Sequence, residues 1–293
     1  MEKTTLKISS RNKGIICIIL SAFCFAFMNA FVRMSGEIPT VQKCFFRNLI
    51  AFFVALFMML RSGEKIKIVK GNLKYLVARA VFGTVGMLCN FYAVDHLVLS
   101  DASMLNKMSP FFSILFSFIL LSERLNFIQG AVVAAAFCGS IFIVKPTLEI
   151  FSNPASLLGL LGGAGAGFAY TMVRILGKRG ESKPFIVLFF SAFSCLSMLP
   201  YIIFNYSPMS LKQLFCLIGA GVAAAGGQFG ITFAYCYAPA KEISVYDYSQ
   251  LIFAMLLGFL FFRQVPDLLS FIGYAIIIFA AVAMFVHNKK YDK

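Results

Sequence analysis

The sequence predicts an all-α membrane protein in which ten transmembrane helices form two inverted five-helix repeats. Hydrophobic residues make up 60% of the 293 residues and charged residues only 13%, whereas about a quarter of the residues in a soluble domain are charged. The apolar residues are gathered into ten runs long enough to cross a bilayer. Similar residues also recur in the two halves of the chain at a constant offset of 141 positions.

The ten apolar runs define the predicted helices. A helix rises about 1.5 Å per residue, so roughly 20 residues are needed to cross about 30 Å of hydrocarbon. Lipid offers the backbone no hydrogen-bond partners, and each run is therefore expected to be helical. Several links between runs are only four to seven residues long, which places consecutive helices antiparallel. The runs cover residues 14–34, 39–60, 73–94, 101–121, 126–144, 157–176, 184–204, 212–236, 243–262 and 267–286.

The positions of lysine and arginine predict the orientation, because cytoplasmic loops of membrane proteins are enriched in both. With a cytoplasmic N-terminus, seventeen of the 26 Lys and Arg residues fall in cytoplasmic segments, four in external segments and five within spans. We therefore expect a multi-pass protein of the cytoplasmic (inner) membrane with both termini in the cytoplasm. This distribution accounts for the net charge of +14 without a nucleic-acid partner.

The internal repeat divides the chain into residues 14–144 and residues 157–286. Each half contains five predicted spans, and an odd number makes the second half enter the membrane from the opposite side. Inverted repeats are the architecture of many secondary transporters, whose substrate sites lie near the midplane between the halves. Simple gene duplication in a membrane protein that transports nothing is the alternative. The matched residues include Phe27 with Phe168, Arg33 with Arg174, Gly86 with Gly227, and Ser103 with Ser244.

Several short segments carry a resemblance to a known family. They are Gln42-Lys43-Cys44-Phe45-Phe46-Arg47, Ser109-Pro110-Phe111-Phe112, Ala169-Tyr170-Thr171-Met172-Val173-Arg174 and the turn Leu121-Ser122-Glu123-Arg124-Leu125. Together with the ten spans and the repeat, they make the chain resemble the EamA type of the drug/metabolite transporter superfamily. The chain departs from the family pattern at Ser122, which replaces a glycine, and in the second half, where Arg263-Gln264-Val265 and Leu251 replace the turn and a proline.

The resemblance implies a central cavity lined by the first, third, fourth, sixth, eighth and ninth spans. Polar side chains within these spans are expected to face that cavity, because polar groups are costly in lipid. Polar contacts that only hold helices together are the alternative for each residue alone. The predicted substrate-binding residues are Asn29, Arg33, Asn90, Asn106, Lys107, Tyr170, Gln228, Tyr248 and Gln250.

Two further residues are predicted to form a gate. Counting helical rise, Lys107 lies roughly 9 Å below the outer face and Asp247 roughly 7 Å above the inner face, which makes a direct bridge between them doubtful. Arg174 ends its span near the inner face, and we expect it to pair with Asp247 and close that end. The alternative is that Arg174 simply reaches the aqueous interface. Arg47 lies too deep in its span for its side chain to reach the aqueous interface, so it is expected to have a partner. A structural role for Arg47 is at least as readily expected as a functional one.

These features favour a secondary transporter that moves a small polar metabolite by alternating access. An amino acid or a related zwitterion is the first choice of cargo, and an S-adenosylmethionine-like metabolite, which the resemblance suggests, is the second. A channel and a membrane enzyme are less favoured, because the halves are inverted and the two histidines and scattered carboxylates form no catalytic cluster. The eight cysteines include no CxxC pair, so neither a metal nor a cofactor is expected. A homodimer is possible.

Overall fold

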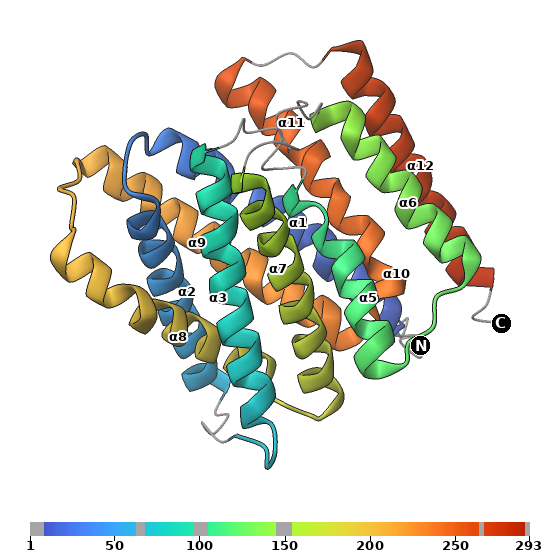
Figure 1. The fold of residues 1–293 in the computed structure, drawn as a ribbon, viewed down its shortest axis with the longest axis horizontal. Coiled ribbons are helices and arrows are strands. Elements are labelled where there is room, and N and C mark those ends of the chain that lie inside the picture. Colours follow the sequence, from blue (N-terminus) through green and yellow to red (C-terminus); the bar gives the residue numbers. More distant parts are fainter. Residues whose placement is uncertain (1–8, 63–67, 97–104, 145–153, 264–266, 291–293) are drawn as a thin grey trace, which may run out of the picture.

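The structure, a computed structural model, describes residues 9–62, 68–96, 105–144, 154–263 and 267–290. Within these ranges the chain is helical and contains no strand. Figure 1 shows the helices gathered into one bundle with both marked ends of the chain on the same side. The elements are α1 (Ser10–Met34), α2 (Thr40–Ser62), α3 (Leu73–His96), α5 (Ser109–Leu121), α6 (Phe127–Val144), α7 (Pro154–Lys178), α8 (Lys183–Phe204), α9 (Leu211–Tyr237), α10 (Ala240–Ile243), η2 (Ser244–Tyr248), α11 (Ser249–Phe262) and α12 (Leu268–Lys290).

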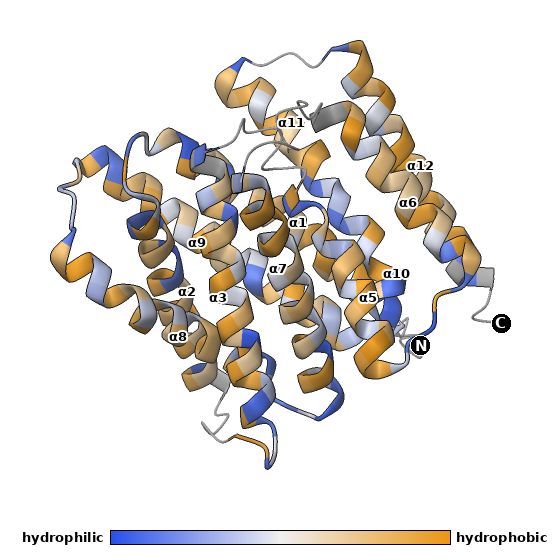
Figure 2. Ribbon diagram, in the orientation of Figure 1, coloured by the Kyte–Doolittle hydropathy of each residue, from blue (hydrophilic) through white to orange (hydrophobic). Residues whose placement is uncertain are grey.

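Eight of the described segments are long and apolar enough to cross a membrane. Two shorter apolar helices, Ser109–Leu121 and Phe127–Phe142, correspond to the fourth and fifth predicted spans. The first four residues of the fourth predicted span lie outside the described residues. Most residues of the helices are hydrophobic, as Figure 2 shows, and many large apolar side chains are exposed, with Phe279 76% exposed. The protein is therefore a multi-pass membrane protein whose outer surface contacts lipid.

The helices of the two halves interleave. Helix α1 packs along α9, α3 along α7, α2 along α8, and α6 along α12. Figure 1 shows α6 and α12 side by side at one edge of the bundle, while α2 and α8 lie toward the other. Each of these pairs joins a helix before residue 145 to a helix after residue 153. The core of the molecule is therefore the interface between the halves.

Two close helix crossings, α3 with α7 and α9 with α1, involve corresponding positions of the repeat. In the second crossing each helix is replaced by its equivalent from the other half. A Cβ on Gly86 of α3 would come within 3.1 Å of the Gly162 carbonyl oxygen of α7. At the position 141 residues after Gly86, a Cβ on Gly227 of α9 would come within 2.6 Å of the Phe25 ring of α1. Small residues allow such close approach of helices in lipid. The two crossings are related by a two-fold exchange of the halves, as the sequence offset predicts.

The ends of α5 and α11 show the same relationship. Ser122 and Arg263 cap these helices in the left-handed conformation, with φ of 55° and 54°. They are 141 residues apart and are the only non-glycine residues with positive φ in the described part of the chain. Glycine suits this conformation better, because a Cβ disfavours it. The two halves thus form the same turn at corresponding positions without a glycine in either.

The two-fold relationship fails at one pair of helices. Helices α7 and α9 pack against each other near their C-terminal ends, where a Cβ on Gly177 would come within 2.8 Å of the Cys236 Cβ. The equivalent helices in the other half of the repeat are α1 and α3. They are not among the helix pairs that pack over several residues within the described ranges. The bundle is therefore closed between α7 and α9 and not between α1 and α3.

Candidate functional site

A buried cluster forms where the fourth and ninth predicted spans meet. The Lys107 Nζ lies 3.3 Å from the Asp247 carboxylate and donates to the Gln250 side-chain oxygen at 2.7 Å. The Tyr248 hydroxyl donates to the Lys107 backbone oxygen at 3.0 Å. Lys107 is 5% exposed and Asp247 is 7% exposed. We call Lys107, Asp247, Tyr248 and Gln250 the lysine–aspartate cluster.

The helices around this cluster are interrupted. Lys107 precedes α5 by two residues, and Asp247 lies in the short 3₁₀ helix η2, two residues before α11. Interrupted helices are a common way to bring polar backbone and side chains to a transporter's binding site. The local sequence helps, because Pro110 occupies the first turn of α5, where a missing backbone N–H leaves no hydrogen bond unmade.

The doubt about a Lys107–Asp247 bridge was therefore wrong. The ninth span begins at Ala240, three residues earlier than expected, and η2 rises about 2 Å per residue where an α-helix rises about 1.5 Å. Both effects place Asp247 deeper in the bundle than a count along a regular helix indicates. The long Lys107 side chain covers the remaining distance.

The expected pair between Arg174 and Asp247 does not form between these described side chains. Arg174 Nε instead lies 3.2 Å from the Glu123 carboxylate, and Lys178 Nζ lies 2.6 Å from the same oxygen. Arg174 also donates to the backbone oxygens of Tyr235 at 3.5 Å and of Cys236 at 3.4 Å. We call Glu123, Arg174 and Lys178 the clasp. It lies where α7 and α9 pack together, and Arg174 has a different partner from the one expected; its role as a gate stays a prediction.

A second buried cluster contains two arginines that the sequence did not assign to the site. Arg79 of α3 is 3% exposed and donates to the Gln228 side-chain oxygen of α9 at 3.1 Å, with its guanidinium carbon 4.0 Å from the Phe190 ring centre. Arg47 of α2 is 8% exposed and donates to the Met87 sulfur at 2.9 Å. Arg47 contacts Met87 and the Arg79 guanidinium lies against Gly83, one helical turn earlier on α3, so the two guanidinium groups lie along the same face of that helix. We call Arg47 and Arg79 the arginine pair.

Tyr170 of α7 lies on the side of the lysine–aspartate cluster. Its ring stacks on Tyr235 of α9 at 5.1 Å between centroids, and the Tyr235 hydroxyl lies 3.5 Å from the Ser244 hydroxyl of η2, the element that contains Asp247. The predicted residue Gln228 lies beside the arginine pair, where it accepts from Arg79. Sequence reasoning located both arginines within spans but could not show that α2 and α3 bring them together. Two intramembrane arginines without a nearby carboxylate in the sequence were the only available signal.

The remaining predicted site residues are placed differently. Asn90 of α3 packs against Gly162 of α7, and its side-chain oxygen is buried without a hydrogen-bond partner. Asn106 is half-buried beside Lys107. Asn29 and Arg33 of α1 are exposed, and Arg33 lies over the Phe262 ring at 4.6 Å. The structure therefore separates these two α1 residues from the lysine–aspartate cluster and the arginine pair.

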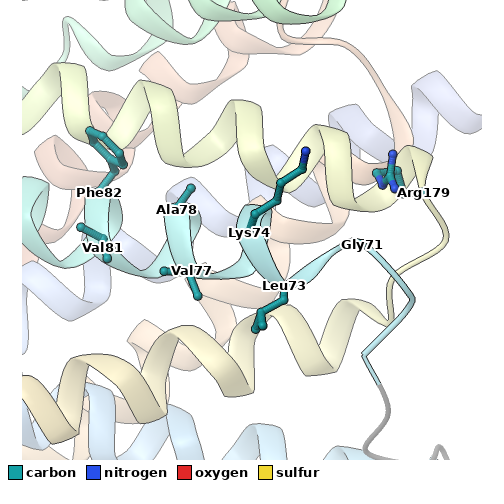
Figure 3. Close-up of a pocket in the computed structure, with 8 residues that line it drawn as sticks. All are labelled: Gly71, Leu73, Lys74, Val77, Ala78, Val81, Phe82 and Arg179. Atoms are coloured by element: carbon teal, nitrogen blue, oxygen red, sulfur yellow. The ribbon is translucent and has the colours of Figure 1, made fainter.

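Two surface hollows lie away from these clusters. One, of about 380 Å³, is lined by Arg11, Arg124, Lys241 and Glu242 among others, and Arg11 Nε lies 2.7 Å from the Glu242 carboxylate. The other, of about 830 Å³, follows α3 on the outside of the bundle between Gly71 and Phe82, with Arg179 at its end (Figure 3). Its walls are mostly apolar and suit lipid acyl chains better than a polar solute.

Comparison with known proteins adds independent information. The model of the EamA-like transporter family matches residues 12–145 and again residues 153–286. The pseudopaline exporter CntI of Pseudomonas aeruginosa is 31% identical over 273 residues, covering 92% of this chain and 95% of that protein. An uncharacterized transporter of Helicobacter pylori is 26% identical over 275 residues, covering 90% of this chain and 92% of that protein.

The chain is also similar to proteins of lower sequence identity. Human solute carrier family 35 member G1 is 25% identical over 269 residues, which are 86% of this chain and 73% of that protein. A protein of known crystal structure superposes with a TM-score of 0.82 at 16% identity, covering 94% of this chain and 98% of that chain. At that identity the structural likeness shows a shared fold and nothing about substrate.

Proposed function

The chain belongs to the EamA-like transporter family, and from this premise we propose that it moves a small polar metabolite across the cytoplasmic membrane by alternating access. The family and its named relatives are transporters, so the protein is a membrane transporter and not an enzyme. Its ten spans form two inverted repeats, residues 14–144 and 157–286, and both termini are cytoplasmic. A homodimer stays a prediction.

The observation that carries this proposal is the broken symmetry of the bundle. The two halves repeat each other's contacts at Gly86 and Gly227, yet α7 packs on α9 while α1 and α3 do not pack in the same way. A carrier with two equivalent halves must break its symmetry, since its site opens to one side at a time. With the proposed orientation, the closed α7–α9 end faces the cytoplasm and the structure is outward-facing.

The clasp supports the same interpretation. Arg174 holds the C-terminal end of α9 through two backbone oxygens and the end of α5 through Glu123. Its repeat equivalent, Arg33, ends α1 on the other side of the bundle. We infer that opening toward the cytoplasm releases Arg174 from α9, and that Arg33 then makes the equivalent contact with the end of α3. The two arginines would thus stabilise opposite states of the cycle.

The cargo is proposed to be an amino acid or a related zwitterion. Both signs of charge lie buried between the halves, at Asp247 and Lys107 and at the arginine pair. A site of this kind suits a solute that carries both charges, because each end can be neutralised. One relative is named as the exporter of pseudopaline, which favours export of a polar metabolite as the direction.

A cross-link across the α7–α9 closure tests alternating access. Gly177→Cys would bring a second thiol against native Cys236, which forms no disulfide in the structure; the two Cβ atoms would be 2.8 Å apart, so α7 and α9 must separate by about 1 Å to reach disulfide geometry. We expect oxidation to join the two and to stop flux from proteoliposomes loaded with amino acids and other small zwitterions, measured by mass spectrometry of the released solutes. A reducing agent should restore the flux. Gly177→Ala and Gly177→Cys with Cys236→Ser provide the matched controls for crowding and for oxidation elsewhere.

The competing functions give different results in this assay. A carrier shows saturation and counterflow and stops when locked. Flux that continues through the oxidised variant would contradict alternating access and indicate a channel. Absence of saturable flux for every solute in the unmodified protein would contradict the proposed cargo class.

A further inference from the structure

The arginine pair carries a charge that the described protein does not neutralise. The only side-chain partner recorded for Arg47 is the Met87 sulfur, and for Arg79 it is the neutral Gln228 amide together with the Phe190 ring. The Nε atoms of both arginines are buried without any hydrogen-bond partner. Among the described residues, no carboxylate lies within ion-pairing distance of either guanidinium group.

Such an arrangement is unfavourable for the protein alone. Charged side chains inside a membrane usually pair with an opposite charge or face a wet cavity. Arginine remains protonated in proteins, so it cannot escape the penalty by losing its proton. Two like charges along the same face of α3 add to the penalty. An anion bound between the two guanidinium groups would remove it.

Guanidinium groups also have a preferred ligand. Each presents a planar fork of N–H donors that matches the two oxygens of a carboxylate or of a phosphate. The unpartnered Nε atoms of Arg47 and Arg79 are members of these forks. The two side chains come from α2 and α3 of the first half, whereas Gln228 and Phe190 come from the second half. A ligand held here therefore contacts both halves.

We propose that the arginine pair is the binding site for an oxyanion group of the transported substrate, so that the substrate carries at least one carboxylate or phosphate. This inference rests on the proposed transport function and narrows its cargo. The opposite end of the substrate reaches the buried Asp247 carboxylate. A cationic amine there exchanges with Lys107 as the partner of that carboxylate.

Thermal unfolding of the purified full-length protein in detergent tests the oxyanion site without requiring transport. The probes are citrate, glutamate, inorganic phosphate and chloride, all at equal ionic strength. Ligands that bind the folded state raise its apparent stability. We expect at least one carboxylate or phosphate probe to raise the melting temperature by several degrees and chloride to leave it unchanged. An equal shift with chloride, or no shift with any oxyanion, would overturn the proposal.

Variants connect any shift to the arginine pair. Arg47→Gln and Arg79→Gln should each abolish it, whereas Arg47→Lys should keep only part of it because lysine lacks the fork. Arg61→Gln is the matched control, because this exposed arginine also lies on α2. Gly83→Ala provides a second test without loss of charge, since the added Cβ would overlap the Arg79 Nη1 and the Phe190 ring. If the oxyanion still raised the melting temperature equally in all four variants at positions 47, 79 and 83, the anion would bind elsewhere and the proposal would be wrong.

Transport separates a failure of this inference from a failure of the proposed function. In the loaded proteoliposomes, the unmodified protein should release solutes that bear a carboxylate or phosphate and should be inhibited by the oxyanion that stabilises it. Saturable release of only neutral or cationic solutes, unchanged in Arg79→Gln, would contradict the oxyanion site while leaving the transporter function intact. Absence of any saturable release would instead contradict the function itself.

Discussion

The lysine–aspartate cluster and the arginine pair are both buried in the same helical bundle, yet they are neutralised differently. Lys107 has Asp247 at 3.3 Å and Gln250 at 2.7 Å, whereas the two arginines have a sulfur, an amide and an aromatic ring. The first cluster is complete within the protein. The second is completed only by an anion from outside. The protein therefore supplies the counter-charge for Lys107 itself, whereas the counter-charge for Arg47 and Arg79 comes from a bound ligand.

This contrast also bears on stability. A buried ion pair contributes little net stability, but loss of one partner leaves a charge that is costly to bury. An uncompensated buried charge lowers the stability of the substrate-free protein, and such losses are common at functional sites. The two clusters should therefore respond in opposite directions when one charge is removed.

The largest effect is expected for Asp247→Asn. This change leaves the Lys107 ammonium, which is 5% exposed, without its counter-charge. We expect a loss of about 3–5 kcal/mol in the free energy of unfolding, measured by denaturation in detergent. The double variant Lys107→Met with Asp247→Asn should recover most of this loss while transport remains impaired. If the double variant were as unstable as the single one, the pair would not be the cause.

Arg47→Met should act in the opposite direction. The substitution removes a buried charge whose only described side-chain partner is the Met87 sulfur, so it leaves no buried acceptor oxygen without its donor. We expect the substrate-free protein to become more stable by about 1–3 kcal/mol and to lose transport. The same unfolding measurement as for Asp247→Asn provides the comparison. A loss of stability as large as that of Asp247→Asn would show that the two clusters do not differ as described.

For Glu123→Gln in the clasp, the change in the free energy of unfolding should lie between those of Asp247→Asn and Arg47→Met. Arg174 and Lys178 share Glu123, and their side chains are 12% and 43% exposed, so water screens part of the charge that is left. We expect a loss of about 1 kcal/mol and faster opening of the α7–α9 end. Faster hydrogen exchange of the last turn of α9, compared with the unchanged last turn of α3, would report that opening. Equal exchange at both ends would argue against a clasp.

The smallest effects on stability are expected at Ser122 and Arg263, the two left-handed caps, which belong to neither charge cluster. Ser122→Gly and Arg263→Gly should each stabilise the protein by about 0.5–1 kcal/mol, because glycine adopts positive φ without strain. The two gains should be similar, since the caps have φ values of 55° and 54°. Unequal gains in thermal unfolding would indicate that the two ends of the bundle differ beyond the clusters and the clasp.

The sequence predicted most of the architecture. The described helix bounds agree with the predicted runs to within four residues, except where the fourth span extends beyond the described ranges and where the ninth is interrupted. The interruption of the ninth span has a local cause, because a run of apolar residues does not show where a helix tightens into a 3₁₀ turn. The offset of 141 also anticipated the paired crossings at Gly86 and Gly227 and the paired caps.

The sequence by itself thus determined the membrane class, the positions of most apolar helices and the presence of two repeats, because composition and spacing along the chain are sufficient for each. Only the tertiary structure decided which charges meet. Lys107 and Asp247 are 140 residues apart in the chain, and Arg79 and Gln228 are 149 residues apart; no local sequence pattern records such contacts. Helix depth estimated along a straight axis failed for Asp247 because the helix is interrupted there. Whether a buried charge is paired depends on the packing of distant helices, and that packing distinguishes the arginine pair from the lysine–aspartate cluster.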